Sequence, residues 1–149
     1  MARPEQFARR LFLHADRLGV NASKLVRQVG LVADQALVLA TPVDKGIARS
    51  NWQVSVTRPI RKVIKAYAPG NKLGIGERRN SSQALAQGAA AIAKYKSENQ
   101  KIYITNNVHY ITLLNAGSSR QAPASFVQIA VNRAVEAVRR SHLLRKSGP

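Results

Sequence analysis

Side chains that commonly do chemistry are sparse in this chain. Its three histidines are His14, His109 and His142, and it contains no cysteine. The three lie in separate elements, and no pair has ligand spacing with another histidine or a carboxylate. The seven Asp and Glu are dispersed, which gives a two-metal nuclease no evident ligand set. The sequence therefore predicts neither a metal site nor a bound cofactor.

One hydrolytic set can nevertheless be written from the residue types. Ser50, His109 and Asp44 would supply a nucleophile, a base and an orienting carboxylate. Ser50 lies between an arginine and an asparagine, without the flanking glycines of a nucleophile elbow. Gly74 and Gly76 likewise lack the third glycine and the Lys-Ser/Thr pair of a phosphate loop. We expect a protein that is not an enzyme, and an activity screen would test the small-hydrolase alternative.

The net charge indicates a polyanionic partner. Twenty-four Lys and Arg against seven Asp and Glu give a formal charge of +17, far more than solubility requires. Two readings stay open: phosphates of a nucleic acid, or an acidic protein surface. Aromatic residues make up 5% of the chain, so a base-stacking platform is not expected. Any contact with DNA should involve the backbone alone.

The basic residues concentrate in two stretches. An arm over about 58–80 has seven cations against a single acid and is interrupted by Pro and Gly, which predicts an extended loop with a short strand at 63–67. A basic tail over 139–149 follows the last expected helix. The candidate phosphate-binding residues are Arg58, Arg61, Lys62, Lys65, Lys72, Arg78, Arg79, Arg139, Arg140, Arg145 and Lys146.

Four helices are expected from periodicity and capping residues. The second is the strongest, with Asn21 or Ser23 as its cap, a stripe that includes Leu25 and Leu39, and an end before Pro42. Its Gly30 should allow a close neighbour. The others are expected over 4–18, from Ser81 or Ser82 through Lys96, and from Pro123 to about Arg140.

Two alternating segments predict a small antiparallel sheet. Residues 51–57 alternate apolar Trp52, Val54 and Val56 with polar neighbours, and 101–105 place Ile102 and Ile104 on one face. At 149 residues the chain has the size of one domain with one core, over about 20–140. The expected fold class is α+β, with long helices packed on the sheet.

No membrane association is expected. The most apolar stretch, 29–43, contains Asp34 and Gln35 and is too short to cross a bilayer. The first residues have neither the apolar core nor the cleavage site of a signal peptide. These features predict a soluble protein.

Two loops rich in turn-forming residues adjoin the expected strands. In the first, Pro42 fixes φ, Asp44 can bond the following backbone, and Gly46 allows positive φ. In the second, 106–107 suits an Asx turn or left-handed geometry, and Tyr110, Ile111 and Leu114 can form one buried helical turn. The residues expected to define the fold or a subunit interface are Thr41, Pro42, Asp44, Gly46, Arg49, Trp52, Asn106, Asn107, Tyr110, Asn115, Gly117, Gln121 and Pro123.

The order of these segments resembles that of the tail-completion, or head–tail connector, proteins of tailed bacteriophages. The motifs are Thr-Pro-Val-Asp-x-Gly-x-x-Arg-x-Asn-Trp at 41–52, Asn-Asn-x-x-Tyr-Ile at 106–111 and Leu-Asn-x-Gly-Ser-Ser-x-Gln-Ala-Pro at 114–123, and 67–70 and 73–76 are also similar. The resemblance spans about 20–138. Position 45, usually small or polar in that family, is here a lysine.

The resemblance implies a structural virion protein of the phage neck, assembled in the host cytoplasm. Its subunits would form a homo-oligomeric ring, sixfold or twelvefold, around the channel through which DNA leaves. The partners would be portal, adaptor or stopper proteins on one side and tail-terminator or tail-tube proteins on the other. The alternative is a stand-alone basic protein that binds nucleic acid without sequence preference, for which the charge is the support.

Overall fold

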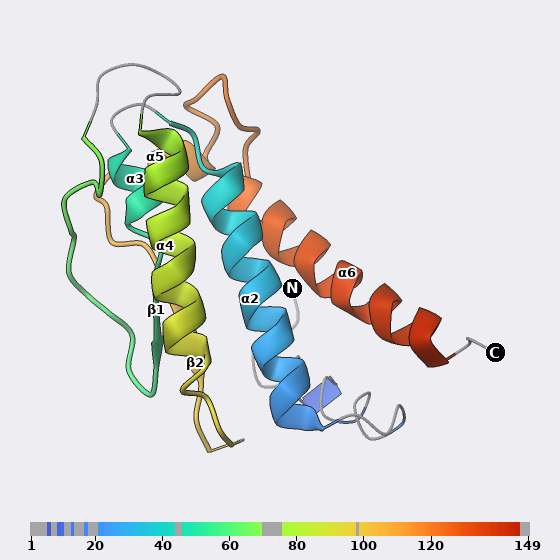
Figure 1. Ribbon diagram of the computed structural model, residues 1–149. Coiled ribbons are helices and arrows are strands. Elements are labelled where there is room, and N and C mark those ends of the chain that lie inside the picture. The colour runs from blue at the N-terminus through green and yellow to red at the C-terminus, as the bar shows by residue number, and fades with distance from the viewer. Residues whose placement is uncertain are drawn as a thin grey trace.

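A computed structural model describes residues 6, 9–10, 13, 17, 21–43, 46–69, 76–97 and 99–146, with side chains up to 141. Within them lie five helices and two strands: α2 (Ala22–Ala40), α3 (Ile47–Ser50), β1 (Gln53–Val56), α4 (Glu77–Ile92), β2 (Ile102–Thr105), α5 (Ile111–Asn115) and α6 (Phe126–Lys146). The α+β class is confirmed, with long helices on a small sheet (Figure 1). Of the helix expected over 4–18, the described residues are helical, and the rest, including His14, lies outside the described residues.

α2 is the central element, and it packs against both α4 and α6 (Figure 1). The expected cap is confirmed, because the Asn21 side chain accepts bonds from the amides of Ser23 and Lys24. The expected stripe is partly wrong: Leu25 is buried, but Leu39 is 54% exposed. The buried residues of α2 are Leu25, Gly30, Ala33, Asp34, Leu37 and Val38.

The two strands form the expected antiparallel pair, with Gln53 opposite Thr105 and Val56 opposite Ile102. Val54 is buried where β1 faces α4. Close approach at Gly30 is confirmed, since a Cβ there would lie 3.2 Å from the Ile102 side chain. The sheet thus packs one face against the helices.

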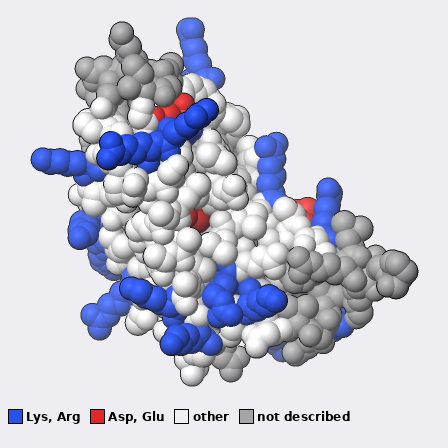
Figure 2. Space-filling model, in the orientation of Figure 1, with Lys and Arg blue, Asp and Glu red and all other residues white. Residues whose placement is uncertain are grey.

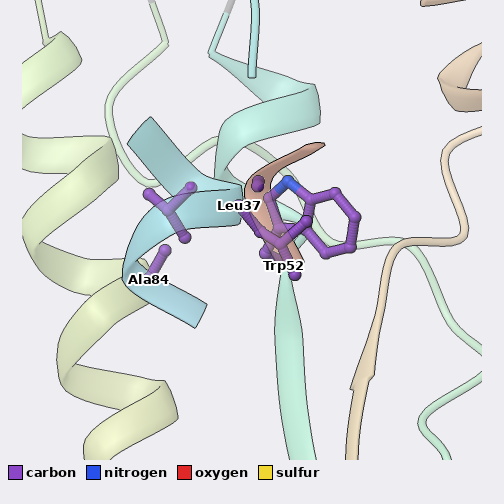
Figure 3. Close-up of a cluster of buried hydrophobic side chains, with 5 residues drawn as sticks. Leu37, Trp52 and Ala84 are labelled. Atoms are coloured by element: carbon purple, nitrogen blue, oxygen red, sulfur yellow. The ribbon is translucent and has the colours of Figure 1, made fainter. Parts of the chain in front are cut away.

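The principal core cluster joins three helices and Trp52, the residue that precedes β1. Trp52 belongs to one buried cluster with Leu37 and Val38 of α2, Ala84 of α4 and Ala130 of α6 (Figure 3). Each of these side chains is at most 5% exposed. Trp52 is therefore the core anchor that the strand pattern predicts.

α4 begins earlier than expected. Its N-cap is Gly76 and its first residue is Glu77, so Ser81 is an interior residue of the helix, which ends at Ile92 and not at Lys96. The arm therefore does not extend to Asn80, and Arg78 and Arg79 belong to α4. The helix starts there because Asn80 and Ser81 are held in buried hydrogen bonds, described below.

α6 also departs from the expected bounds. It begins at Phe126 instead of Pro123 and continues to Lys146, beyond Arg140. Residues 139–146 are consequently the last turns of a helix, and the tail as expected is wrong over that range. Phe126, Ala130, Ala134 and Val138 form its buried stripe.

The helical turn expected near Ile111 is present as α5, but it has no buried residue, and its Leu113 is 62% exposed. Among the described residues, no helix is both long and apolar enough to cross a bilayer.

Candidate functional site

The two loop segments that carry the family resemblance lie together in space. The side-chain amide of Gln121 bonds the backbone of Val43 twice: its Nε2 donates to the Val43 carbonyl at 2.8 Å, and its Oε1 accepts from the Val43 N–H at 2.9 Å. The Asn106 side chain donates to the Ala48 carbonyl at 2.8 Å. Side chains of the second segment thus bind the backbone of the first across 58 to 78 residues of sequence.

Arg49 joins the end of α2 to the beginning of α4. The residue is 7% exposed, and its guanidinium donates to the carbonyls of Leu39 and Thr41 at 3.2 and 2.8 Å. It also pairs with Glu77 at 2.6 Å and bonds the Ser81 hydroxyl at 3.3 Å. A cation at a helix C-terminus and an acid in a first turn both complement the helix dipoles.

Thr41 supports the core tryptophan. Its hydroxyl donates to the Leu37 carbonyl and accepts from Trp52 Nε1, both at 2.6 Å. Pro42 is buried beside it. Gly46 has φ +77°, as expected, and a Cβ there would collide with the Asn80 side chain. Asp44, between these residues, lies outside the described residues.

Side chains of the sheet's outer face hold the arm. Ser55, Gln53 and Asn51 donate in turn to the carbonyls of residues 58, 62 and 64 at 2.5 to 2.8 Å, and Thr105 and Asn107 both donate to that of residue 60. Alternate carbonyls of an extended segment are therefore bound by alternate side chains of the two strands and of the residues that flank them. The arm forms no strand, so the short strand expected at 63–67 is wrong.

The far end of the arm is held by two buried residues. The Asn80 side chain accepts from the Ala68 amide at 2.7 Å and donates to its carbonyl at 3.1 Å. Ser50 donates to Asn80 at 3.1 Å and accepts from the Tyr67 amide at 3.3 Å. The arm is thus held over residues 58–68.

Four basic side chains of the arm are open to solvent. Arg58, Arg61, Lys62 and Lys65 are all exposed. Arg78 and Arg79 of α4 and Arg139 and Arg140 of α6 are exposed as well, so the predicted set is spread over three elements. Lys72 lies outside the described residues, and Arg145 and Lys146 are described as helix backbone alone. In Figure 2, cations surround a largely uncharged centre instead of forming one patch on that face.

The remaining motif residues shape the second loop. Asn106 forms the expected Asx turn, accepting from the Val108 amide at 3.2 Å. Asn115 accepts from the Val127 amide at 3.0 Å, at the start of α6. Tyr110 lies edge-on to His109, with the ring centroids 5.0 Å apart. Asn107, Gly117, Gln121 and Pro123 are exposed.

Two residues of the candidate hydrolytic set, Ser50 and His109, are described by the structure. Ser50 is fully buried, and its hydroxyl is used by Asn80 and the arm. His109 is exposed. In the described part of the chain, no group of three His, Cys, Asp or Glu could hold a metal ion.

Sequence reasoning missed Asp34 as a special residue. It is 2% exposed, and its Oδ1 has no hydrogen-bond partner. It faces Gly88 of α4, where an added Cβ would collide with its carboxyl oxygen. Burial raises the pKa of Asp34 from 3.8 to about 7. The available signal was an acid within the most apolar stretch, 29–43, which we used only to argue against a membrane span.

Comparison of the chain with family models, curated proteins and solved structures gave no match.

Proposed function

We propose that this chain is a structural subunit of the neck of a tailed bacteriophage, forming a ring between capsid and tail around the DNA channel. The observation that carries the proposal is the contact between the two segments that resemble the connector family. The bonds from Gln121 to Val43 and from Asn106 to Ala48 join residues of both motifs. The resemblance therefore concerns segments that act together in the fold, and not two unrelated short matches.

The roles of the motif residues support a mechanical function. Polar side chains such as Arg49, Ser50 and Asn51 are buried and bonded to backbone groups. Buried polar side chains that are bonded to the backbone at several points fix a local shape. Fixed loop shapes suit a heterologous ring, in which each subunit must fit two different neighbours.

Imaging tests the ring directly. Negative-stain electron microscopy of the purified chain, alone and mixed with portal and tail-tube proteins of the same virion, should show rings with a central channel. Immunogold labelling of virions should place the chain at the neck. A chain that stays monomeric in every mixture and is absent from virions would refute the assignment.

A second part of the proposal concerns DNA. The exposed cations Arg58, Arg61 and Lys62 lie on a backbone held by the sheet, so they can meet phosphates without reading bases. Gel-shift titrations at several salt concentrations should show binding that weakens steeply with salt. The absence of binding at low salt would refute the proposed DNA contact but not the proposed ring.

The stand-alone nucleic-acid-binding protein is the competing function, and the formal charge of +17 favours it. Tight, salt-dependent DNA binding by a chain that forms no ring with any neck protein would select it.

A further inference from the structure

An open groove of about 810 Å³ runs between α2 and α4. Leu31 of α2 borders it and is 43% exposed, although it is a large apolar side chain. Ala89 of α4 and Ala93, the residue after its end, line the other side and are exposed, while the lining residues Ile92 and Tyr95 are buried. The floor and walls are thus mainly apolar, which is unusual for so basic a chain.

Cations border the groove. Its basic lining residues are Lys24, Arg27 and Lys96, and none of the described residues that line it is an Asp or Glu. Lys24 and Lys96 are exposed, and Arg27 is positioned by a 2.8 Å bond to the Tyr95 carbonyl. In Figure 2 the face over α2 and α4 is largely uncharged at its centre, with Lys and Arg toward its lower margin.

We propose that this groove binds an acidic amphipathic helix of a partner protein. Its apolar side chains would pack between Leu31 and the alanines, and its Asp or Glu would face Lys24, Arg27 and Lys96. A groove formed by two helices fits helix-in-groove recognition. Small residues on α4 permit close approach, and complementary charge selects the partner.

The charges argue against the other occupants. A second copy would bring a formal charge of +17 and only seven dispersed acids, so it offers no acidic helix to these cations. Duplex DNA would satisfy the cations but would leave the Leu31 side chain and the exposed alanines without an apolar partner. The proposal goes beyond the ring assignment and holds for either candidate function.

Fluorescence anisotropy with the full chain tests the proposal. The probe is a labelled synthetic peptide of Leu, Ala and Glu with its leucines on one helical face, at about 0.15 M salt. The test variant is Ala89→Glu, and Ala137→Glu is its matched control, because Ala137 is an exposed alanine of α6. Both substitutions change the charge equally and replace one good helix former with another. Leu31→Ser tests the apolar contact without altering the charge.

The expected result is a loss of affinity of about tenfold or more for Ala89→Glu and Leu31→Ser, as for central residues of an interface. Ala137→Glu should change the affinity by less than about twofold, because salt screens a charge that lies far from the groove. A peptide of scrambled order, with no apolar face, should bind weakly.

Four results would overturn the proposal. Equal binding of the ordered and scrambled peptides, or equal losses for the two alanine variants, would mean general attraction between charges. Sedimentation that shows self-association abolished by Ala89→Glu alone would assign the groove to a second copy. DNA binding that is abolished by Ala89→Glu but not by Ala137→Glu would assign the groove to nucleic acid. Ring imaging of Ala89→Glu tests the neck assignment separately.

Discussion

The buried carboxyl of Asp34 should make the stability of this protein depend on pH in an unusual direction. Its pKa rises from 3.8 in the unfolded chain to about 7 in the fold because burial disfavours the charged form. The folded state therefore holds this proton more tightly than the unfolded state does. The contribution of Asp34 to the free energy of unfolding is constant below about pH 4, falls between pH 4 and 7, and levels off above.

The size of the effect follows from the shift. A displacement of about three pKa units corresponds to roughly 4 kcal/mol of lost stability at pH 8, as an upper bound. Asp34→Asn keeps the shape of the side chain and cannot ionise. It should be more stable than the wild type at pH 8 by about 2–4 kcal/mol, after allowance for a still imperfectly bonded polar group. Near pH 4 the two proteins should have similar stability.

The assay is urea unfolding followed by the fluorescence of Trp52, the single tryptophan, which lies in the core. Wild type and Asp34→Asn are compared from pH 4 to pH 8, so that other titrating groups cancel. Glu136→Gln is the control, because Glu136 forms an exposed pair with Arg140 and should change stability by less than about 1 kcal/mol at every pH. A difference between wild type and Asp34→Asn that stays constant over this range would refute the reasoning, as would a variant less stable at pH 8.

Three further predictions concern Arg49, Thr57 and the arm. Arg49→Lys should lower the free energy of unfolding by about 1–3 kcal/mol, because an ammonium cannot reach the same carbonyls and Glu77 together; urea unfolding measures this, and a loss no larger than that of exposed Arg140→Lys would contradict it. Thr57 has φ +90°, so Thr57→Gly should raise thermal stability by about 1 kcal/mol through relief of strain. Thr112→Gly, within α5, should do the opposite, and destabilisation by both would count against strain at Thr57. Arg61→Gln with Lys62→Gln should reduce the slope of log affinity for DNA against log salt by about two, and an unchanged slope would place the phosphate contacts elsewhere.

Local chemistry was enough to predict several elements. Asn21 as a cap and the alternation around Val54 depend on nearest neighbours in sequence, and the antiparallel pairing joins the two segments that this alternation marks as strands. The positive φ of Gly46 and the Asx turn at Asn106 also follow from the residue type. These features were predicted correctly because no distant contact overrides them.

The errors arose where distant contacts decide. The apolar residues of α2 cover much of its circumference, so the sequence could not show that packing by both α4 and α6 buries Leu37 and Val38 while Leu39 stays exposed. α4 begins at Glu77 because Arg49 pairs with that residue and Asn80 binds the arm. Neither partner adjoins the helix in sequence, so a serine cap was the better local prediction.

The motif residues also differ in whether distant contacts in the fold bury them. Thr41, Pro42, Arg49 and Trp52 are buried and serve the fold, so they have no exposed surface to offer a neighbouring subunit. Gln121 differs: the residue is exposed, although its side-chain amide bonds both the N–H and the carbonyl of Val43. The proposed ring would therefore have to form its subunit contacts through exposed loop residues and surfaces outside the first motif. The basic side chains of the arm satisfy that condition, because the sheet binds the arm's carbonyls and its cations remain exposed.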